Sequence, residues 1–161
     1  MQQLLDTELV PFRRQIEDGA EAVMVAHISL PQINGDNMPA TLSKRIVDGL
    51  LRRELGFEGV VITDSMMMQA VTDSYTTAEA AQLAVEAGVD MILMPRQPEE
   101  AYRSLLTAVK AGVVSEERID ESVLRILELK HRYQLFDPAP LADKSILGCE
   151  EHRSVIGKIY E

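Results

Sequence analysis

The chain has 161 residues, and its 26 acidic and 16 basic side chains give a formal net charge of -10 at pH 7. Binding to nucleic acid or to an anionic membrane needs cations at the protein surface, so this charge disfavours both partners. The single cysteine excludes an internal disulfide, the sequence predicts no metal site and no cofactor, and no apolar run approaches the roughly 18 residues that span a bilayer.

The first predicted elements are a helix and a strand. Apolar residues at helical spacing predict a helix over Leu4–Glu17. Pro11 fits only in a first turn, so the true start lies later than Leu4, and Asp18-Gly19 ends the helix. A strand over Val23–Ala26 follows. Residues 29–40 contain two prolines and a glycine and are predicted to form a long loop.

The next helix leads into the most informative strand. Thr41 or Ser43 is expected to cap this helix, and Gly56 is expected to end it. The apolar run Val60–Ile62 then predicts a buried strand, which ends abruptly at the carboxylate of Asp64. Chemistry in alternating barrels is carried by the carboxyl ends of the strands, although an aspartate there also commonly caps a helix.

The second half of the chain repeats the alternation. Thr76 and Glu79 predict a capping box for a helix that runs through Ala87 and ends at Gly88, followed by a strand over Val89–Met94. Three strands that alternate with helices predict a parallel sheet in an α/β fold. Three strands are too few to close a barrel.

The chain is predicted to finish with helices and a linker. A helix is expected over residues 98–111, and Asp120 is expected to cap a final amphipathic helix. From Asp137 the periodicity is lost and two prolines indicate a linker, with a short helix over His152–Tyr160. The first residues do not show the pattern of a signal peptide, which leaves the compartment open.

Several ordered segments resemble glycoside hydrolase family three, which includes bacterial β-N-acetylhexosaminidases and many β-glucosidases. The run Leu55–Met68 resembles the nucleophile segment of that family, with its Leu-Gly-Phe-x-Gly start, branched strand, Asp and following Met. Other segments resemble parts of the same family in the same order: Ala22–His27, Pro39–Ser43, Ala87–Asp90, Ile119–Val123 and Leu135–Asp137.

The resemblance implies a fold larger than this chain. Residues 1–137 would form the C-terminal part, about three strands, of a (β/α)8 TIM-type barrel, with the other five strands lying before Met1. Residues 138–161 would form a linker and the start of a following domain. Exposed strand edges and apolar faces drive association, so we expect self-association or strands supplied by another chain.

The resemblance also implies retaining hydrolysis of β-O-glycosidic bonds, with Asp64 as the catalytic nucleophile and a carbohydrate as partner. In the hexosaminidase branch the acid/base lies on a loop with a Lys-His and a Gly-His-Gly motif. This sequence has no Gly-His-Gly, and its Lys-His pair, Lys130-His131, lies in the predicted final helix and not on such a loop. His27 and Met68 are the candidate substrate-binding residues, and core packing is expected for at least two of Met66, Met67 and Met68.

Two alternatives to a glycosidase were open at this point. A phosphate-binding barrel, such as an aldolase, usually has a glycine-rich loop after its last strands, whereas the run Pro95–Pro98 has no glycine. A non-catalytic barrel fragment that folds by association is the second alternative, because the chain lacks a recognisable acid/base.

Overall fold

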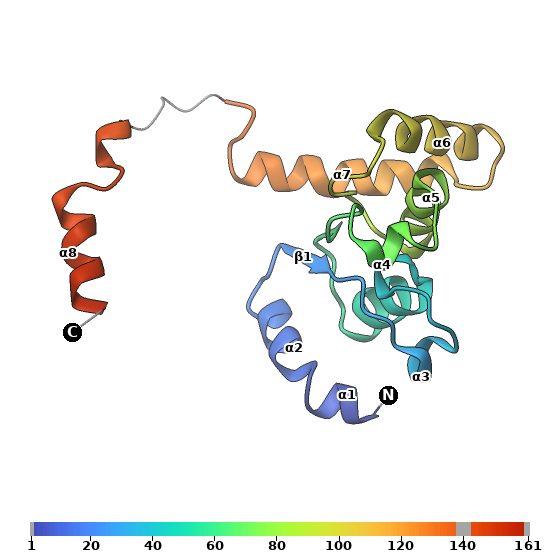
Figure 1. Ribbon diagram of the computed structural model, residues 1–161, viewed down its shortest axis with the longest axis horizontal. Helices are drawn as coiled ribbons and strands as arrows, with labels where there is room; N and C mark the ends of the chain where they lie inside the picture. The colour runs from blue at the N-terminus through green and yellow to red at the C-terminus, as the bar shows by residue number, and fades with distance from the viewer. Residues whose placement is uncertain (1, 138–142, 160–161) are drawn as a thin grey trace.

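The computed structural model describes residues 2–137 and 143–159 and has short parallel strands covered by helices, which confirms the α/β class (Figure 1). The elements in chain order are α1 (Gln2–Asp6), α2 (Val10–Glu17), β1 (Ala22–Val25), α3 (Pro31–Asn34), the 3-10 turn η1 (Ala40–Leu42), the π-helix η2 (Arg45–Glu54), β2 (Val60–Thr63), α4 (Gln69–Thr72), α5 (Thr77–Ala87), α6 (Pro98–Lys110), α7 (Glu116–Arg132), the 3-10 turn η3 (Lys144–Ile146) and α8 (Glu150–Ile159).

The sheet is smaller than the sequence predicts. β1 and β2 pair in parallel, as expected. The predicted strand Val89–Met94 joins β2 through a single parallel bridge, between Ile62 and Met91, so the prediction of a full third strand was wrong. The ladder stops there because the Leu93 amide donates to the side-chain Oγ1 of Thr63, at 2.9 Å, in place of a backbone carbonyl.

The two faces of this sheet have different surroundings. Val61, on the helix-covered face, is fully buried in the main core, and Val23 packs against the same core. Met24 pairs in register with Ile62, and Ile62 pairs with Met91. Paired residues of parallel strands point to the same side, so these three side chains form one row. Met24 is 53% exposed and Met91 39%. This Met24–Ile62–Met91 row is an open apolar face.

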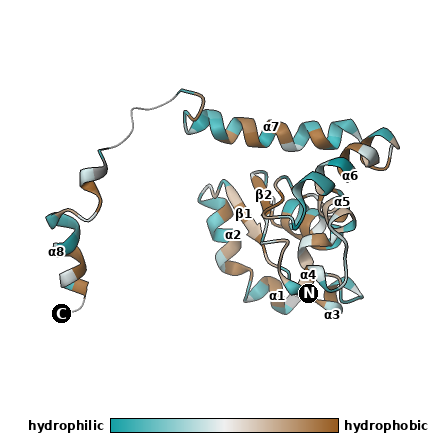
Figure 2. Cartoon of the chain, turned by 45° about the horizontal axis from the view of Figure 1, so that its top comes forward, coloured by the Kyte–Doolittle hydropathy of each residue, from teal (hydrophilic) through white to brown (hydrophobic). Residues whose placement is uncertain are grey.

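The main core lies between the covered face and helices η2 and α5. Figure 2 shows the apolar colouring of β2 and of the helix faces around it. The buried members of this cluster are Leu42, Val47, Leu51, Phe57, Val61, Met66, Val71, Ala80, Ala84, Ala87 and Val89. Burial of this apolar surface is the main favourable term that holds the helices on the sheet.

Local capping signals are confirmed where their partners are near in sequence. Before α5, Thr76 Oγ1 accepts from the Glu79 amide at 3.2 Å, and the Glu79 carboxylate accepts from the Thr76 amide at 2.9 Å. The helix ends at Gly88, whose φ of 112° an L-residue would rarely adopt. Pro11 lies in the first turn of α2, as predicted. Before η2, Ser43 Oγ accepts from the Ile46 amide at 3.3 Å, although Lys44 occupies the N-cap position of that helix and its side chain makes no capping bond.

Three boundary predictions were wrong. The expected first helix is two helices, α1 and α2, and the predicted loop over residues 29–40 contains α3. The last large helix begins earlier than Asp120, because Ser115 Oγ accepts from the Arg118 amide at 3.2 Å and caps α7. Asp120 therefore lies inside the helix, where its side chain caps nothing.

The C-terminal helix α8 lies apart from the other helices in Figure 1, and none of its residues is buried. This helix matches the one predicted to begin at His152, although Tyr160 and the linker residues 138–142 lie outside the described residues. The division into residues 1–137 and 138–161 stays a prediction. Along the described part of the chain, no helix has the length and apolarity needed to cross a membrane.

Candidate active site

Asp64 directly follows β2 on the open side of the sheet. Its amide donates to the Val25 carbonyl at 3.0 Å, which extends the parallel ladder one residue beyond the strand. Alternation along a strand therefore directs its side chain to the same face as the Met24–Ile62–Met91 row, while Thr63 between them is fully buried toward the helices. The carboxylate is partly buried, and its one hydrogen-bond partner among the described residues is the Ser65 amide, at 2.7 Å.

His27 lies beside this carboxylate loop. Its ring is 8% exposed, and both nitrogens have protein partners. Nδ1 is 2.9 Å from Thr41 Oγ1, and Nε2 is 3.0 Å from the Ser65 carbonyl oxygen. The sequence placed His27 near the site, and the structure brings it to the residue that follows Asp64. That it binds substrate stays a prediction, because the structure contains no sugar.

The three consecutive methionines have different environments. Met66 is 4% exposed and belongs to the main core. Met67 is 54% exposed and Met68 45%. The expectation that at least two of them pack in the core was therefore wrong, since only one position of the turn after Asp64 points toward the helices. Met68 is accessible at the start of α4, and its contact with a sugar stays a prediction.

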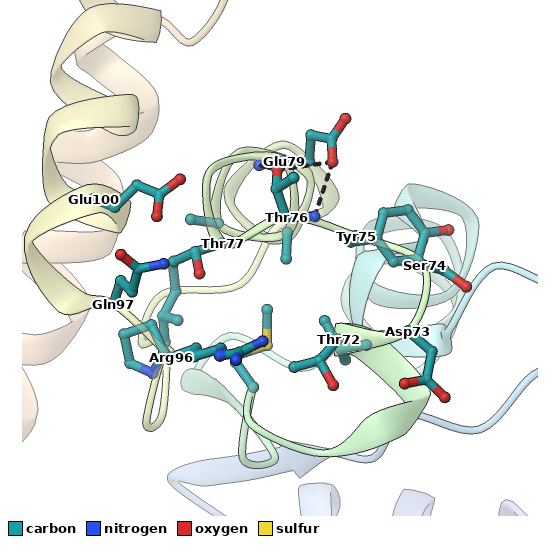
Figure 3. A pocket seen from close by; sticks show the side chains of 16 residues that line it. Thr72, Asp73, Ser74, Tyr75, Thr76, Thr77, Glu79, Arg96, Gln97 and Glu100 are labelled. Carbon is teal, nitrogen blue, oxygen red and sulfur yellow. Dashed lines mark hydrogen bonds between the residues drawn. The ribbon is translucent and has the colours of Figure 1, made fainter.

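A pocket of about 430 Å³ lies on the helix side of the same loop, between Met66, the start of α5 and the segment that follows Met94 (Figure 3). Its wall carries several hydroxyl groups and the exposed guanidinium of Arg96. Asp64, His27 and Met68 do not line it. The pocket is therefore separate from the open face that carries the carboxylate. No group of three or more His, Cys, Asp and Glu side chains within residues 2–137 and 143–159 is arranged to hold a metal ion.

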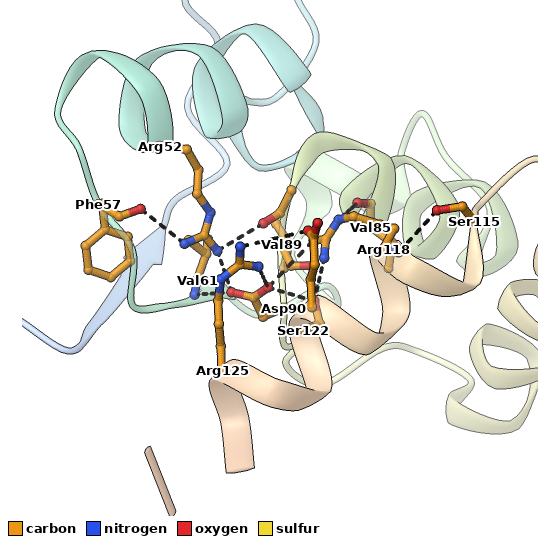
Figure 4. A network of polar contacts seen from close by, with 12 residues as sticks. Arg52, Phe57, Val61, Val85, Val89, Asp90, Ser115, Arg118, Ser122 and Arg125 are labelled. Carbon is orange, nitrogen blue, oxygen red and sulfur yellow. Dashed lines mark hydrogen bonds and ion pairs between the residues drawn. The ribbon is translucent and has the colours of Figure 1, made fainter. Parts of the chain in front are cut away.

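Asp90, at the opposite end of the strands, is the centre of a buried charge cluster (Figure 4). Its fully buried carboxylate accepts from Arg52 at 2.5 Å, from Arg125 at 3.1 Å and from Ser122 at 2.7 Å. The Val61 amide adds a bond of 2.9 Å, and the Arg118 guanidinium lies 3.7 Å away. Burial lowers the pKa of the Arg52 and Arg118 side chains, which the charge of Asp90 partly offsets.

This cluster joins η2 and α7 to the beginning of the third strand segment, so its role is structural. The cluster was not predicted from the sequence. An aspartate one residue after Val89, at the start of an apolar run, was the available signal, since a charge in such a run is buried only when it has partners. The hydrogen-bond partners of Asp90 lie 29 to 38 residues away in the sequence.

Comparison with known proteins identifies the family. Residues 1–129 match the family described as Glycosyl hydrolase family 3 N terminal domain. The chain belongs to glycosyl hydrolase family 3. A beta-N-acetylglucosaminidase/beta-glucosidase from Cellulomonas fimi is 33% identical over 130 residues, which are 75% of this chain and 23% of that protein.

Two solved structures of high similarity sharpen this relationship. A glycoside hydrolase family 3 beta-N-acetylglucosaminidase from Paenibacillus sp. str. FPU-7 is 42% identical with a TM-score of 0.91, covering 98% of this chain and 31% of that chain. The beta-glucoside phosphorylase BglX is 29% identical with a TM-score of 0.89, covering 98% of this chain and 31% of that one. The family 3 chain described here spans about a quarter of the length of the curated relatives it matches.

Proposed function

We propose that this family 3 chain supplies Asp64 as the nucleophile of a retaining β-glycosidase that acts on β-N-acetylhexosaminides or β-glucosides. One observation carries the proposal: the Asp64 carboxylate lies at the carboxyl end of β2, on the open face, with a single hydrogen bond from residues 2–137 and 143–159. Its position in the segment that resembles the family's nucleophile segment, and the names of the relatives, support the same role.

The proposed reaction has two steps. The Asp64 carboxylate attacks the anomeric carbon, the glycosidic C–O bond breaks, and the leaving oxygen takes a proton from a general acid. The product is a glycosyl ester on Asp64. Water then attacks the same carbon, gives its proton to the base form of that acid, and releases the carboxylate with net retention. Met68, exposed at the start of α4, is proposed to line the sugar site.

The acid/base is proposed to come from residues outside this chain, together with the remaining strands of the (β/α)8 barrel. A general acid is typically worth about 10²- to 10⁴-fold in rate. The chain alone should therefore hydrolyse unactivated glycosides very slowly, and dinitrophenyl glycosides, whose leaving group needs no proton, should suffer less. Robust cleavage of a natural disaccharide by the purified chain would contradict this part of the proposal.

Asp64→Asn tests the nucleophile. The variant is made in a protein that completes the barrel, with residues 2–137 joined to the complementary part of the Paenibacillus relative. Turnover of nitrophenyl β-N-acetylglucosaminide and β-glucoside should be nearly abolished, whereas Asp73→Asn, an exposed aspartate nearby, should leave it unchanged. Near-normal turnover in Asp64→Asn, in a chimera that is active without the change, would overturn the assignment.

A fluorinated donor sugar identifies the attacking atom and the acceptor. Peptide mapping after trapping should find the glycosyl ester on Asp64, and labelling at another carboxylate would contradict the proposal. The same assay with inorganic phosphate distinguishes two fates of the ester. Release of free sugar indicates a hydrolase, and release of glycosyl phosphate would indicate chemistry like that named for the phosphorylase relative.

We also propose that the Met24–Ile62–Met91 row is covered by other strands when the protein is assembled. Met24 and Met91 are 53% and 39% exposed on a face that lies beside the edge of β1. Exposed sheet edges with apolar faces favour association. Sedimentation of the purified chain at micromolar concentration should show self-association. A stable monomer that binds no hydrophobic dye would contradict it and would leave the non-catalytic fragment that folds by association without support.

A further inference from the structure

The loop that carries Asp64 is held at three consecutive residues, by β1 with the residues just after it and by the third strand segment. The Asp64 amide donates to the Val25 carbonyl at 3.0 Å, at the end of β1. The Met66 amide donates to the Leu93 carbonyl at 3.0 Å, in the third strand segment. Between them, the Ser65 carbonyl accepts from His27 Nε2 at 3.0 Å. The outer two contacts use backbone atoms, so His27 is the side chain that holds the centre of this loop among the described residues.

The partners of His27 determine which ring nitrogen carries a proton. A carbonyl oxygen only accepts, so the contact with Ser65 requires a hydrogen on Nε2. The Thr41 hydroxyl faces Nδ1, and it either donates to a neutral ring or accepts from a charged one. When the hydroxyl accepts from a charged ring, its own hydrogen can be donated to the Ala26 carbonyl oxygen, at 3.0 Å. Nε2 can therefore donate to the Ser65 carbonyl whether the ring is neutral or positively charged.

Thr41 fixes the ring in place. Its side chain is fully buried, and Oγ1 lies 3.1 Å from the Val25 carbonyl as well as 3.0 Å from that of Ala26. The hydroxyl thus connects η1 to the end of β1, and His27 follows β1 in the chain. His27 is 8% exposed, so its ring has little room to leave this position. A rigid support of this kind is what a reacting side chain needs from its neighbours.

We propose that His27 is a positioning residue for Asp64: its Nε2–H, oriented by Thr41, holds the Ser65 carbonyl and thereby sets the direction of the adjacent carboxylate. This inference rests on the proposed function, since the positioned group is the proposed nucleophile. It assigns His27 a role that needs no direct contact with the sugar. A reacting group displaced by about 1 Å commonly loses about 10²-fold in rate, so such support has a measurable effect.

Hydrogen exchange on the purified chain tests the support without any catalysis. His27→Phe keeps the ring but removes both nitrogens, and the Ser65 carbonyl keeps its second donor, the Met68 amide at 3.1 Å. Loss of one hydrogen bond of ordinary net strength should speed exchange of the Asp64 and Met66 amides about tenfold. The exchange rate of the Met91 amide, which donates to the Val61 carbonyl, should change less than about twofold.

His27→Gln is the conservative variant, because its side-chain amide can place a donor near the position of Nε2. It should restore slow exchange at the loop, and His131→Phe, an exposed histidine on α7, is the matched control. A uniform rise in exchange across the sheet, or equal rates in the Gln and Phe variants, would overturn the proposal. The first result would mean that His27 only stabilises the fold.

Kinetics of the completed barrel give the second readout. His27→Phe should lower kcat about 10²-fold with KM changed less than about twofold, and His27→Gln should recover much of that loss. An unchanged kcat, or a rise in KM alone, would overturn the positioning role. If Asp64→Asn keeps its activity, the proposed nucleophile fails, whereas the exchange result still shows whether His27 holds the loop.

Discussion

Two aspartates lie at opposite ends of neighbouring strand segments, and their carboxylates differ in burial and in hydrogen-bond partners. Asp90, at the amino end, has a fully buried side chain, and its carboxylate has three arginines, a serine hydroxyl and a backbone amide around it. Asp64, at the carboxyl end, is partly buried, and within the described part of the chain it accepts one hydrogen bond, from the Ser65 amide. A carboxylate whose lone pairs are all engaged holds structure together, whereas one with free lone pairs is available to react.

With Asp64 as the proposed nucleophile, this difference assigns stability to one end of the sheet and the proposed chemistry to the other. Alternating barrels follow the same division, with stability at the amino ends of the strands and catalysis at the carboxyl ends. Substitutions at the two ends should therefore have unequal effects on unfolding, and each measurement below can confirm or contradict the division.

The largest effect on stability is expected from Asp90→Asn. The change removes the negative charge from a buried site and leaves Arg52, Arg118 and Arg125 facing an uncharged amide. Breaking a buried ion pair in this way costs about 3–5 kcal/mol, and much of that is the penalty of the unpaired charges. Urea unfolding of the chain measures it. A loss below about 1 kcal/mol would show that the cluster is not the main support of the amino end.

Gly59→Ala should have the next largest effect, also at the amino end. A Cβ at this position would lie 2.4 Å from the Glu21 carbonyl oxygen, which is backbone and moves little. Forcing extra volume into a packed site costs about 1–3 kcal/mol. Unfolding measurements on Gly59→Ala, with Gly157→Ala as a control whose Cβ would meet nothing within 4 Å, separate the clash from the loss of glycine.

Thr76→Ala should cost about 1 kcal/mol, since it removes the side-chain cap of α5. The effect should depend on pH. Hydrogen bonds from the Thr76 amide and hydroxyl lower the pKa of Glu79. A carboxylate whose pKa is lower in the folded than in the unfolded state stabilises the fold at pH values above the unfolded-state pKa. That contribution is lost as the pH falls through the folded-state pKa. The gap between wild type and Thr76→Ala should therefore narrow below about pH 4.5. A gap that widens there would contradict the capping role.

The smallest effect on stability is expected from Asp64→Asn, even though it should remove the activity. The amide keeps an acceptor for the Ser65 hydrogen bond, so unfolding should change by less than about 0.5 kcal/mol. Unfolding curves of the Asp64→Asn and Asp90→Asn variants, recorded side by side, compare the two ends directly. Equal losses of unfolding free energy in the two variants would show that the two ends of the sheet contribute equally to stability.

The sequence predicts those parts of the fold whose partners are near in the chain. The capping box needs only Thr76 and Glu79, and the end of α5 needs only Gly88, so both could be predicted. Asp64 became a candidate because a short apolar run ends at it, and its role as nucleophile stays a prediction. The cap of α7 was misplaced at Asp120, since Ser115 offers the same chemistry five residues earlier and only the start of the helix decides between them.

The remaining features depend on residues that meet only in the folded chain. The third strand was predicted over six residues from its apolar pattern, but a strand exists only where a neighbour pairs with it, and one bridge is present. His27 contacts Thr41, 14 residues away, and Ser65, 38 residues away. No periodicity or spacing connects these positions, so the hydrogen bonds that support the Asp64 loop were not predictable.

The methionines of the open face give the protein a built-in chemical reporter. Peroxide converts an accessible thioether to a sulfoxide and spares a buried one. Met66, at 4% exposure, is protected in the chain as it stands, whereas Met24 and Met91 are accessible. Oxidation of these two side chains, normalised to Met66 and read by mass spectrometry, therefore records whether the open face is covered. A sulfoxide there would also place a polar group on an apolar row, so oxidation before assembly would hinder the strands that are proposed to cover it.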